Sequence, residues 1–132
     1  MLWQMTMAEK QRQWTAALGG LRTAQDLNNT EWIIQMVPAG GGKPQTDTIS
    51  FVEGKFLSAQ MDFQGFTRSN YSASQESGGK LVWETMQTLG SGTASWRAEI
   101  ENERMQGVLS LRQEGKAPQD FSFISAQYRR KE

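Results

Sequence analysis

The stretch "GTASWRAEIENERMQGVLSL" (Gly92–Leu111) alternates apolar and polar residues on both sides of Asn102-Glu103. Such alternation places successive side chains on opposite faces of a strand, and a short polar turn joins two such strands into a hairpin. If Asn102-Glu103 is the turn, one face pairs Ile100 with Met105, Ala98 with Gly107, and Trp96 with Leu109. The polar residues then share the other face, so the hairpin is predicted to have one dry side and one wet side.

The same register extends from this hairpin to the strands beside it. Toward the N-terminus it pairs Leu81 with Ile100, Trp83 with Ala98, Thr85 with Trp96, Ala73 with Trp83, and, on the wet face, Glu84 with Arg97. Toward the C-terminus it pairs Leu111 with Phe121, Leu109 with Phe123, and Arg112 with Asp120. A slip by one residue would turn the whole apolar set toward water, so agreement across neighbouring strands predicts that the apolar face is enclosed.

Period-two patterns recur along the chain after Asn28. They predict eight strands, in the ranges 31–37, 46–52, 55–61, 69–76, 80–88, 93–101, 104–111 and 120–128. The connections are short, several contain glycine, and no helical pattern intervenes, which is typical of an antiparallel meander. We expect a mainly β fold, in which residues 28–132 form an eight-stranded antiparallel up-and-down barrel preceded by an N-terminal α-helix.

Residues 1–27 have a helical pattern, with apolar residues at steps of three and four along one stripe. Gly19-Gly20 offers a stop, so we predict an amphipathic helix from about Trp3 to Leu18 and a short helical piece or turn near 21–26. The stripe has two interpretations. It packs against its own barrel, or it docks on a protein partner, because tryptophan and methionine are enriched in interface cores. The candidate partner-binding residues are Trp3, Met7, Trp14 and Leu18.

The composition excludes several kinds of chemistry. The chain has no cysteine and no histidine, which removes disulfides, thiolate metal sites and the commonest general base. Lys+Arg and Asp+Glu are both 14, a balance that argues against a dedicated nucleic-acid surface. No apolar run approaches the roughly 18 residues of a membrane-spanning helix. We therefore expect no metal, no cofactor, no nucleic-acid partner and no membrane span.

The barrel part of the chain resembles the lipocalin-like, or calycin-type, small β-barrels. "LNNTEW" (Leu27–Trp32) lies where those families enter their first strand with a Gly-x-Trp sequence, and "DFSFISAQYRR" (Asp120–Arg130) resembles their terminal aromatic strand. The resemblance also implies an arginine near the last strand, for which Arg129 and Arg130 are the candidates. "SNYSASQESGGKLVWETMQT" and the opening hairpin are similar to small bacterial barrel domains that are often exported. What the resemblance implies is a fold, without a particular activity.

A large set of mostly aromatic and sulphur-containing side chains is predicted to point inward: Trp32, Met36, Phe51, Phe56, Tyr71, Trp83, Thr85, Trp96, Met105, Phe121 and Phe123. They could line a cavity for a small apolar molecule, with Tyr71, Thr85, Gln60 and Gln87 as polar anchors. They could equally fill the core, because eight strands enclose a space that side chains can occupy completely. The sequence leaves both interpretations open.

Catalytic groups are scarce, since no histidine is present to activate a serine. Asp47, predicted to lie inward opposite Gln60, is the one carboxylate that suggests a hydrolase. The stretch "AGGGK" (Ala39–Lys43) lacks the serine or threonine and the helix of a phosphate-binding loop. We therefore expect no catalytic residues and no enzyme.

The sequence favours a non-catalytic barrel domain, an accessory subunit that docks on a protein partner or larger assembly through the N-terminal helix and the barrel surface. The alternative is a calycin-like carrier of a small hydrophobic ligand. We expect an extracytoplasmic location, periplasmic or secreted. Residues 1–10 lack the pattern of a signal peptide, so such a signal would lie outside the given sequence.

Overall fold

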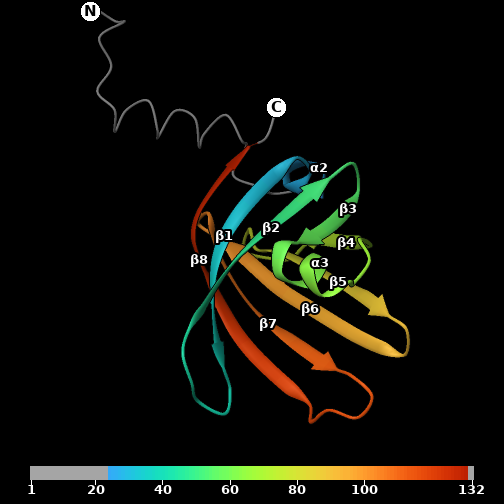
Figure 1. Ribbon diagram of the computed structural model, residues 1–132. Helices are drawn as coiled ribbons and strands as arrows, with labels where there is room; N and C mark the ends of the chain where they lie inside the picture. Colours follow the sequence, from blue (N-terminus) through green and yellow to red (C-terminus); the bar gives the residue numbers. More distant parts are fainter. Residues whose placement is uncertain (1–23, 131–132) are drawn as a thin grey trace, which may run out of the picture.

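The computed structural model describes residues 24–130, which form a closed antiparallel barrel (Figure 1). Each strand pairs with its sequence neighbours, and the last strand pairs with the first. The strands are β1 (Thr30–Pro38), β2 (Gln45–Val52), β3 (Lys55–Ser58), β4 (Ser69–Gln75), β5 (Leu81–Leu89), β6 (Gly92–Glu101), β7 (Arg104–Arg112) and β8 (Gln119–Arg130). The predicted mainly β, up-and-down barrel is confirmed.

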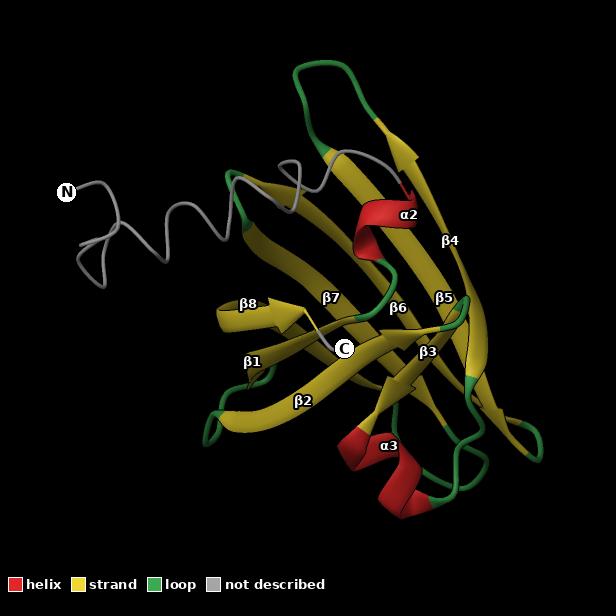
Figure 2. Ribbon diagram, turned by 90° about the horizontal axis from the view of Figure 1, so that it is seen from above, coloured by secondary structure: helices red, strands yellow, loops and turns green. Residues whose placement is uncertain are grey.

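In the described part of the chain, two short helices accompany the strands: α2 (Ala24–Leu27) and α3 (Ala59–Gln64). Figure 2 shows them well apart, α2 shortly before β1 and α3 directly after β3. α2 overlaps the short helical piece predicted near residues 21–26. The predicted amphipathic helix from Trp3 to Leu18 lies outside the described residues, together with the stripe Trp3, Met7, Trp14 and Leu18.

The opening hairpin has the predicted turn and register. Asn102 and Glu103 have φ of 53° and 61°, the left-handed values that a two-residue hairpin turn matched to strand twist requires. Trp96 pairs with Leu109 as predicted, and the pairings of β4 with β5 and of β5 with β6 also follow the predicted register. Alternation and turn chemistry together were therefore sufficient for β4 to β7.

The pairing of β7 with β8 differs from the predicted register by two residues. The structure pairs Leu109 with Phe121, Gly107 with Phe123, and Ser110 with Asp120. The predicted pairs Leu111–Phe121, Leu109–Phe123 and Arg112–Asp120 were therefore wrong as directly opposed pairs. A shift of two residues keeps every side chain on its predicted face, so apolar alternation cannot distinguish the two registers. The loop between these strands is longer than a two-residue turn and does not set the register either.

The predicted third strand, 55–61, was wrong in its second half, where α3 begins. Ser58 caps this helix, and its hydroxyl accepts a hydrogen bond from the N–H of Met61 at 3.1 Å. Gly65, with a φ of 104°, ends the helix in the left-handed conformation that glycine adopts readily. A serine before the segment and a glycine after it are helix-capping signals, which the strand pattern concealed.

The barrel closes where β8 meets β1, and an aromatic stack marks this seam. The rings of Trp32 and Tyr128 lie 4.3 Å apart between centroids and within 17° of parallel. Trp32 donates its indole N–H to the hydroxyl of Thr30 at 2.9 Å, and that hydroxyl donates to the carbonyl of Leu27. Arg130, at the end of β8, donates to the carbonyl oxygens of Asp26 and Asn28. The two ends of the described chain are thus held together.

Candidate functional site

The residues predicted to point inward do so. Ten of them are buried, and Tyr71 is half-buried at the edge of the core. Trp32, Phe51, Phe56 and Trp83 have exposed fractions of 0%. A side chain that lined a water-sized space would expose part of its surface to that space. The barrel interior beside these four rings is therefore filled by side chains, and their role in ligand binding stays a prediction.

Aromatic rings contact one another across the interior. Phe51 meets Phe56, Tyr71 and Trp83 edge-on, with centroids 4.9 to 5.5 Å apart. Phe56 continues the contacts to Trp96, whose ring meets Phe123. Edge-to-face pairs at these distances add to the stability that burial supplies. The rings thus form one packed cluster that connects β2, β3, β4, β5, β6 and β8.

Three of the proposed polar anchors bond to the protein itself. Gln87 is fully buried; it accepts the indole N–H of Trp96 at 2.9 Å and donates to the carbonyl of Thr67 at 3.0 Å. The hydroxyl of Thr85 donates to the carbonyl of Asn70 at 2.6 Å. The hydroxyl of Tyr71 donates to the side chain of Asn28 at 3.3 Å, and burial raises its pKa. Each of these three groups thus has its hydrogen-bond partner within the protein.

Trp83 is the exception, because its buried indole nitrogen has no hydrogen-bond partner. Its ring lies against Phe51 and Phe56, and it pairs with Ala73 and Ala98 on the neighbouring strands. An unpaired buried N–H costs free energy that a water or a ligand oxygen would recover. With an exposed fraction of 0%, however, the ring leaves no space for such an oxygen.

Asp47 lies inward as predicted, and it is 3% exposed. Its carboxylate accepts the N–H groups of Thr48 at 2.8 Å and Gln60 at 3.0 Å, and the hydroxyl of Ser58. Burial raises the pKa of Asp47, and these hydrogen bonds oppose that rise. Ser58 is fully buried and faces the first turn of α3. The pair therefore caps a helix, and the serine hydroxyl does not reach the surface. Gln60, the fourth proposed anchor, contributes its side-chain amide to the carbonyl of Thr46.

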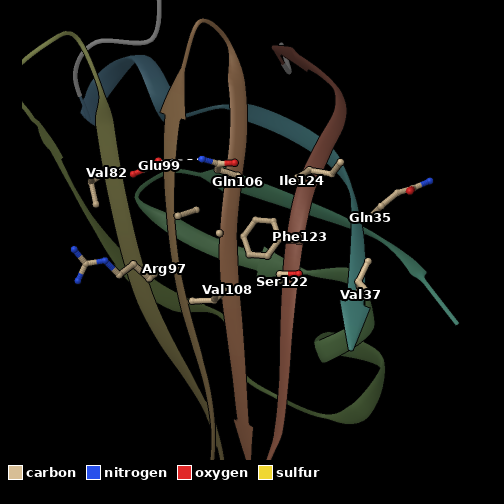
Figure 3. A pocket seen from close by; sticks show the side chains of 12 residues that line it. Gln35, Val37, Val82, Arg97, Glu99, Gln106, Val108, Ser122, Phe123 and Ile124 are labelled. Carbon is tan, nitrogen blue, oxygen red and sulfur yellow. Dashed lines mark hydrogen bonds between the residues drawn. The ribbon is translucent and has the colours of Figure 1, made fainter. Parts of the chain in front are cut away.

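The outer surface carries a hollow of about 590 Å³, lined by residues of β5, β6, β7, β8 and β1. Figure 3 shows it with the ring of Phe123 at its centre and side chains from the five strands around it. Three of these are exposed and apolar: Val37 at 44%, Val108 at 50% and Ile124 at 58%. We call this site the outer hollow. Large apolar side chains gathered on an exposed surface are a feature of binding sites.

The floor of the outer hollow depends on a glycine. Gly107 pairs with Ala98 on one side and with Phe123 on the other. A Cβ at this position would lie 2.5 Å from the Cβ of Ala98 and closer still to the carbonyl oxygen of Arg97. The strands β6 and β7 therefore approach each other here in a way that only glycine allows.

Charged side chains surround the apolar part of the outer hollow. Arg97 pairs with Glu84 at 3.9 Å, and Glu99 pairs with Lys80 at 3.5 Å. Gln106 donates to Glu99 at 3.1 Å, which lowers the pKa of this carboxylate, and Lys80 lowers it further. The predicted Glu84–Arg97 pair on the wet face is confirmed. Positive and negative side chains are both present at the edge of the outer hollow, so neither sign dominates the electrostatic potential of the site.

Val37, Val108 and Ile124 were not among the functional residues expected from the sequence. The alternation placed all three on the outward face, where an apolar residue breaks the pattern. Single exposed apolar residues are common, so each carried little information alone. Their proximity depends on β1, β7 and β8 lying side by side, which the closure of the barrel brings about.

Within residues 24–130, no helix is long and apolar enough to cross a membrane, and no three acidic side chains are placed to hold a metal ion. Comparison of the chain with protein-family models, with curated proteins and with solved structures found no match.

Proposed function

We propose that this chain is a non-catalytic β-barrel domain that binds a protein partner through the outer hollow. The observation that carries the proposal is the position of the exposed apolar side chains. Val37, Val108 and Ile124 gather in one hollow on the outer wall, while the interior is occupied by rings that expose none of their surface. The hollow and the exposed apolar side chains therefore occur together on the outer wall of the barrel.

The interior supports the carrier alternative less well. A ligand there would have to displace Phe51, Phe56 or Trp83, each of which contacts other rings. Ligand pockets are usually formed before the ligand arrives. Carrier function would require the barrel to open, whereas binding at the outer hollow requires no rearrangement of the fold.

The chemistry of the outer hollow suits a protein surface. Interfaces between proteins have an apolar centre and a polar, hydrated edge, and here apolar side chains lie between Arg97 and Glu99 of β6 on one side and Gln35 of β1 on the other. The balance of the two charge signs does not favour a polyanion such as nucleic acid. An accessory domain of a larger assembly is the class of function that fits this site.

We further propose that the barrel is of the lipocalin-like, calycin type, which the resemblance implied. The position of Arg130 supports this assignment, because its guanidinium donates to two carbonyl oxygens just before β1, beside the Trp32–Tyr128 stack. The other candidate, Arg129, pairs with Glu31 on the outer surface. The extracytoplasmic location is part of the same proposal.

A photo-crosslinking amino acid at Val108 in the native cell tests the proposed function. We expect a covalent adduct with one protein, which is then purified and titrated against the unmodified chain. Val108→Asp places a charge in the apolar centre and should weaken binding by at least about tenfold, as for other central interface residues. The barrel should keep its thermal stability, because residue 108 faces outward.

Phe63→Asp is the matched control. Among residues 26–130, Phe63 is the most exposed large apolar residue, at 92%. It lies on α3, which packs on β2 and β3. Its replacement should leave the affinity unchanged. Equal losses in both variants, or no adduct from a folded chain labelled at residue 108, would contradict a binding role for the outer hollow.

A further inference from the structure

We propose that two copies of this chain pair along β4, antiparallel, with Ser74 of one copy directly opposite Ser74 of the other. This inference goes beyond the proposed function, because β3 and β4 do not line the outer hollow. It gives the barrel a second interaction surface, made of the backbone groups at the edge of a strand.

The joint between β3 and β4 is short, although the barrel is closed. β3 pairs with β4 at only two positions, and the last of them is Lys55–Asn70. β5 pairs with β4 as far as Gln75, and Figure 2 shows the β4–β5 hairpin extending beyond β3. Among the strands of residues 24–130, Tyr71–Gln75 therefore pairs with β5 alone.

The backbone groups of Ala73 and Gln75 point to this open side. Successive residues of an antiparallel strand direct their N–H and C=O groups to alternate neighbours. Glu76 donates its backbone N–H to the carbonyl of Lys80, just before β5, so the even-numbered residues of β4 face β5. Ala73 and Gln75 thus present their N–H and C=O groups to an incoming strand.

The fold covers the corresponding overhang of β2 and leaves that of β4 open. α3 packs beside β2, where Gln60 donates its side-chain amide to the backbone carbonyl of Thr46. α2 contacts β4, yet Ser74 and Gln75 remain exposed. Tyr71–Gln75 also contains no charged residue and no proline, the residues with which exposed strand edges usually resist pairing.

The register follows from these backbone groups. With Ser74 opposite Ser74, each Ala73 lies opposite Gln75 of the second copy, and both pairs exchange their two backbone hydrogen bonds. A pair centred on Ala73 would instead put Gln75 of the second copy beside Tyr71, where the turn before Lys55 already lies. Ser74 is small and exposed, so two copies of it fit opposite each other.

Charge complementarity supports the same register. It puts Glu76 of the second copy opposite Ser72, two residues along β4 from Asn70, and Lys55 lies beside Asn70. Alternation directs Glu76 and Lys55 to the outer face, about 7 Å apart along the strand. Lys55 donates to Asn70 at 2.6 Å, and its flexible side chain can reach the carboxylate of Glu76. The two-fold symmetry of the pair forms this ion pair twice.

Disulfide trapping in the full chain tests the register. The chain has no cysteine, so Ser74→Cys carries the only thiol. A non-hydrogen-bonded antiparallel pair brings the two Cα atoms of residue 74 to about 4.5 Å, which a disulfide spans. Ser72→Cys, on the same face of β4, is the matched control, because its two copies are offset by about 14 Å along the paired strands.

We expect Ser74→Cys to form a disulfide-linked dimer at least about tenfold faster than Ser72→Cys under mild oxidation, because only its thiols meet. Non-reducing electrophoresis at successive times measures both rates. Equal rates, or no linked dimer from a folded Ser74→Cys chain, would overturn the inference.

A charge swap tests the pairing without a covalent bond. Sedimentation velocity of the unmodified chain should show a monomer that forms a dimer as the concentration rises. Ser74→Lys places like charges opposite each other and should weaken the dimer by at least about tenfold, as should Ser74→Glu, and mixing the two variants should restore it. A chain that stays monomeric at every concentration, or a dimer that persists in a folded Ser74→Lys chain, would overturn the inference.

Val108→Asp separates this dimer from association through the outer hollow. The variant should dimerise like the unmodified chain, because residue 108 lies on β7. A dimer that is lost in Val108→Asp and retained in Ser74→Lys would assign self-association to the outer hollow and overturn pairing along β4. That outcome would leave the crosslinking test at Val108 valid, so the two proposals fail independently.

Discussion

The inside of the barrel and the outer hollow are both rich in apolar side chains, yet they differ in what surrounds those side chains. Inside, Phe51 and Trp83 contact other rings and have exposed fractions of 0%. Outside, Val108 and Ile124 expose half or more of their surface. The apolar side chains of the interior are already buried in the folded barrel. Those of the outer hollow remain exposed, so a partner could still bury them.

Under the proposed function, this difference separates a region that stabilises the fold from a region that binds. Removing atoms from the interior should cost folding free energy, because a packed cluster cannot close around a cavity. Removing atoms from the outer hollow should weaken the proposed binding and leave the stability of the fold unchanged. Four predictions test the division, in order of decreasing effect on stability.

Phe51→Ala should have the largest effect, because it deletes a ring that contacts three others. We expect a loss of about 3–5 kcal/mol in the free energy of unfolding, as for other large-to-small core substitutions. Ile124→Ala, the matched substitution in the outer hollow, should change it by less than about 0.5 kcal/mol. Urea denaturation followed by far-ultraviolet circular dichroism measures both. Similar losses would contradict the distinction between the two regions.

Gly107→Ala tests the point where the two regions meet. The added methyl group would overlap Ala98 and the carbonyl oxygen of Arg97, so the strands must separate, at a cost of about 1–3 kcal/mol. Gly40→Ala is the control, because a Cβ there meets nothing within 4 Å. Thermal unfolding of the two variants should show a lower Tm only for the first. An unchanged Tm for Gly107→Ala would mean that the close approach of β6 and β7 is easily relieved.

Trp96→Phe and Trp83→Phe compare two indoles of the interior. The first variant leaves the side-chain oxygen of Gln87 buried without its donor, whereas the second removes an N–H that has no partner. We expect Trp96→Phe to destabilise the fold more than Trp83→Phe by about 1–2 kcal/mol, the cost of one buried unsatisfied group. Denaturant titrations of both single variants give this difference directly. A greater loss in Trp83→Phe would point to a bound water or ligand on its indole nitrogen.

Asp47→Asn should have the smallest effect, visible as a change in pH dependence. Burial holds the pKa of Asp47 above its ordinary value near 3.8. The folded state therefore favours the protonated acid, and its contribution to stability is complete below the unfolded pKa and is lost as the pH rises through the folded pKa. Subtracting the variant's stability from that of the unmodified chain should give a curve that falls as pH rises above about 4.

The difference curve is needed because other carboxylates act in the opposite sense. Hydrogen bonds from Gln106 and Arg112 lower the pKa values of Glu99 and Asp120, so these groups stabilise the fold at higher pH and lose that contribution as the pH falls. Their contributions cancel in the subtraction. A difference curve that rises with pH would mean that the hydrogen bonds to Asp47 outweigh its burial.

The sequence predicted the faces of the strands better than their exact partners. For β4 to β7, tight turns and alternation together gave the observed pairs. Between β7 and β8 the same alternation was compatible with two registers, and the observed one differs from the prediction by two residues. The inward-facing residues were correctly placed in both cases, because a shift of two preserves the face.

The candidate site was the less predictable part. The interior aromatic set could be read from the sequence, but whether it surrounds a cavity depends on how the rings of strands distant in sequence fill the same space. The outer hollow could not be read at all, because Val37 and Ile124 are 87 residues apart in the chain and lie on adjacent strands only after β8 pairs with β1.

By itself, the sequence determined that the chain forms a meander with one dry face, because side-chain direction in a strand is a local property with a period of two. Only the tertiary structure decided that aromatic rings pack together inside the barrel without exposed surface, that β7 and β8 pair in the observed register, and that three exposed apolar residues share one hollow. These properties depend on distances between strands that local alternation does not specify. They follow from the packing of rings and from the closure of β8 on β1.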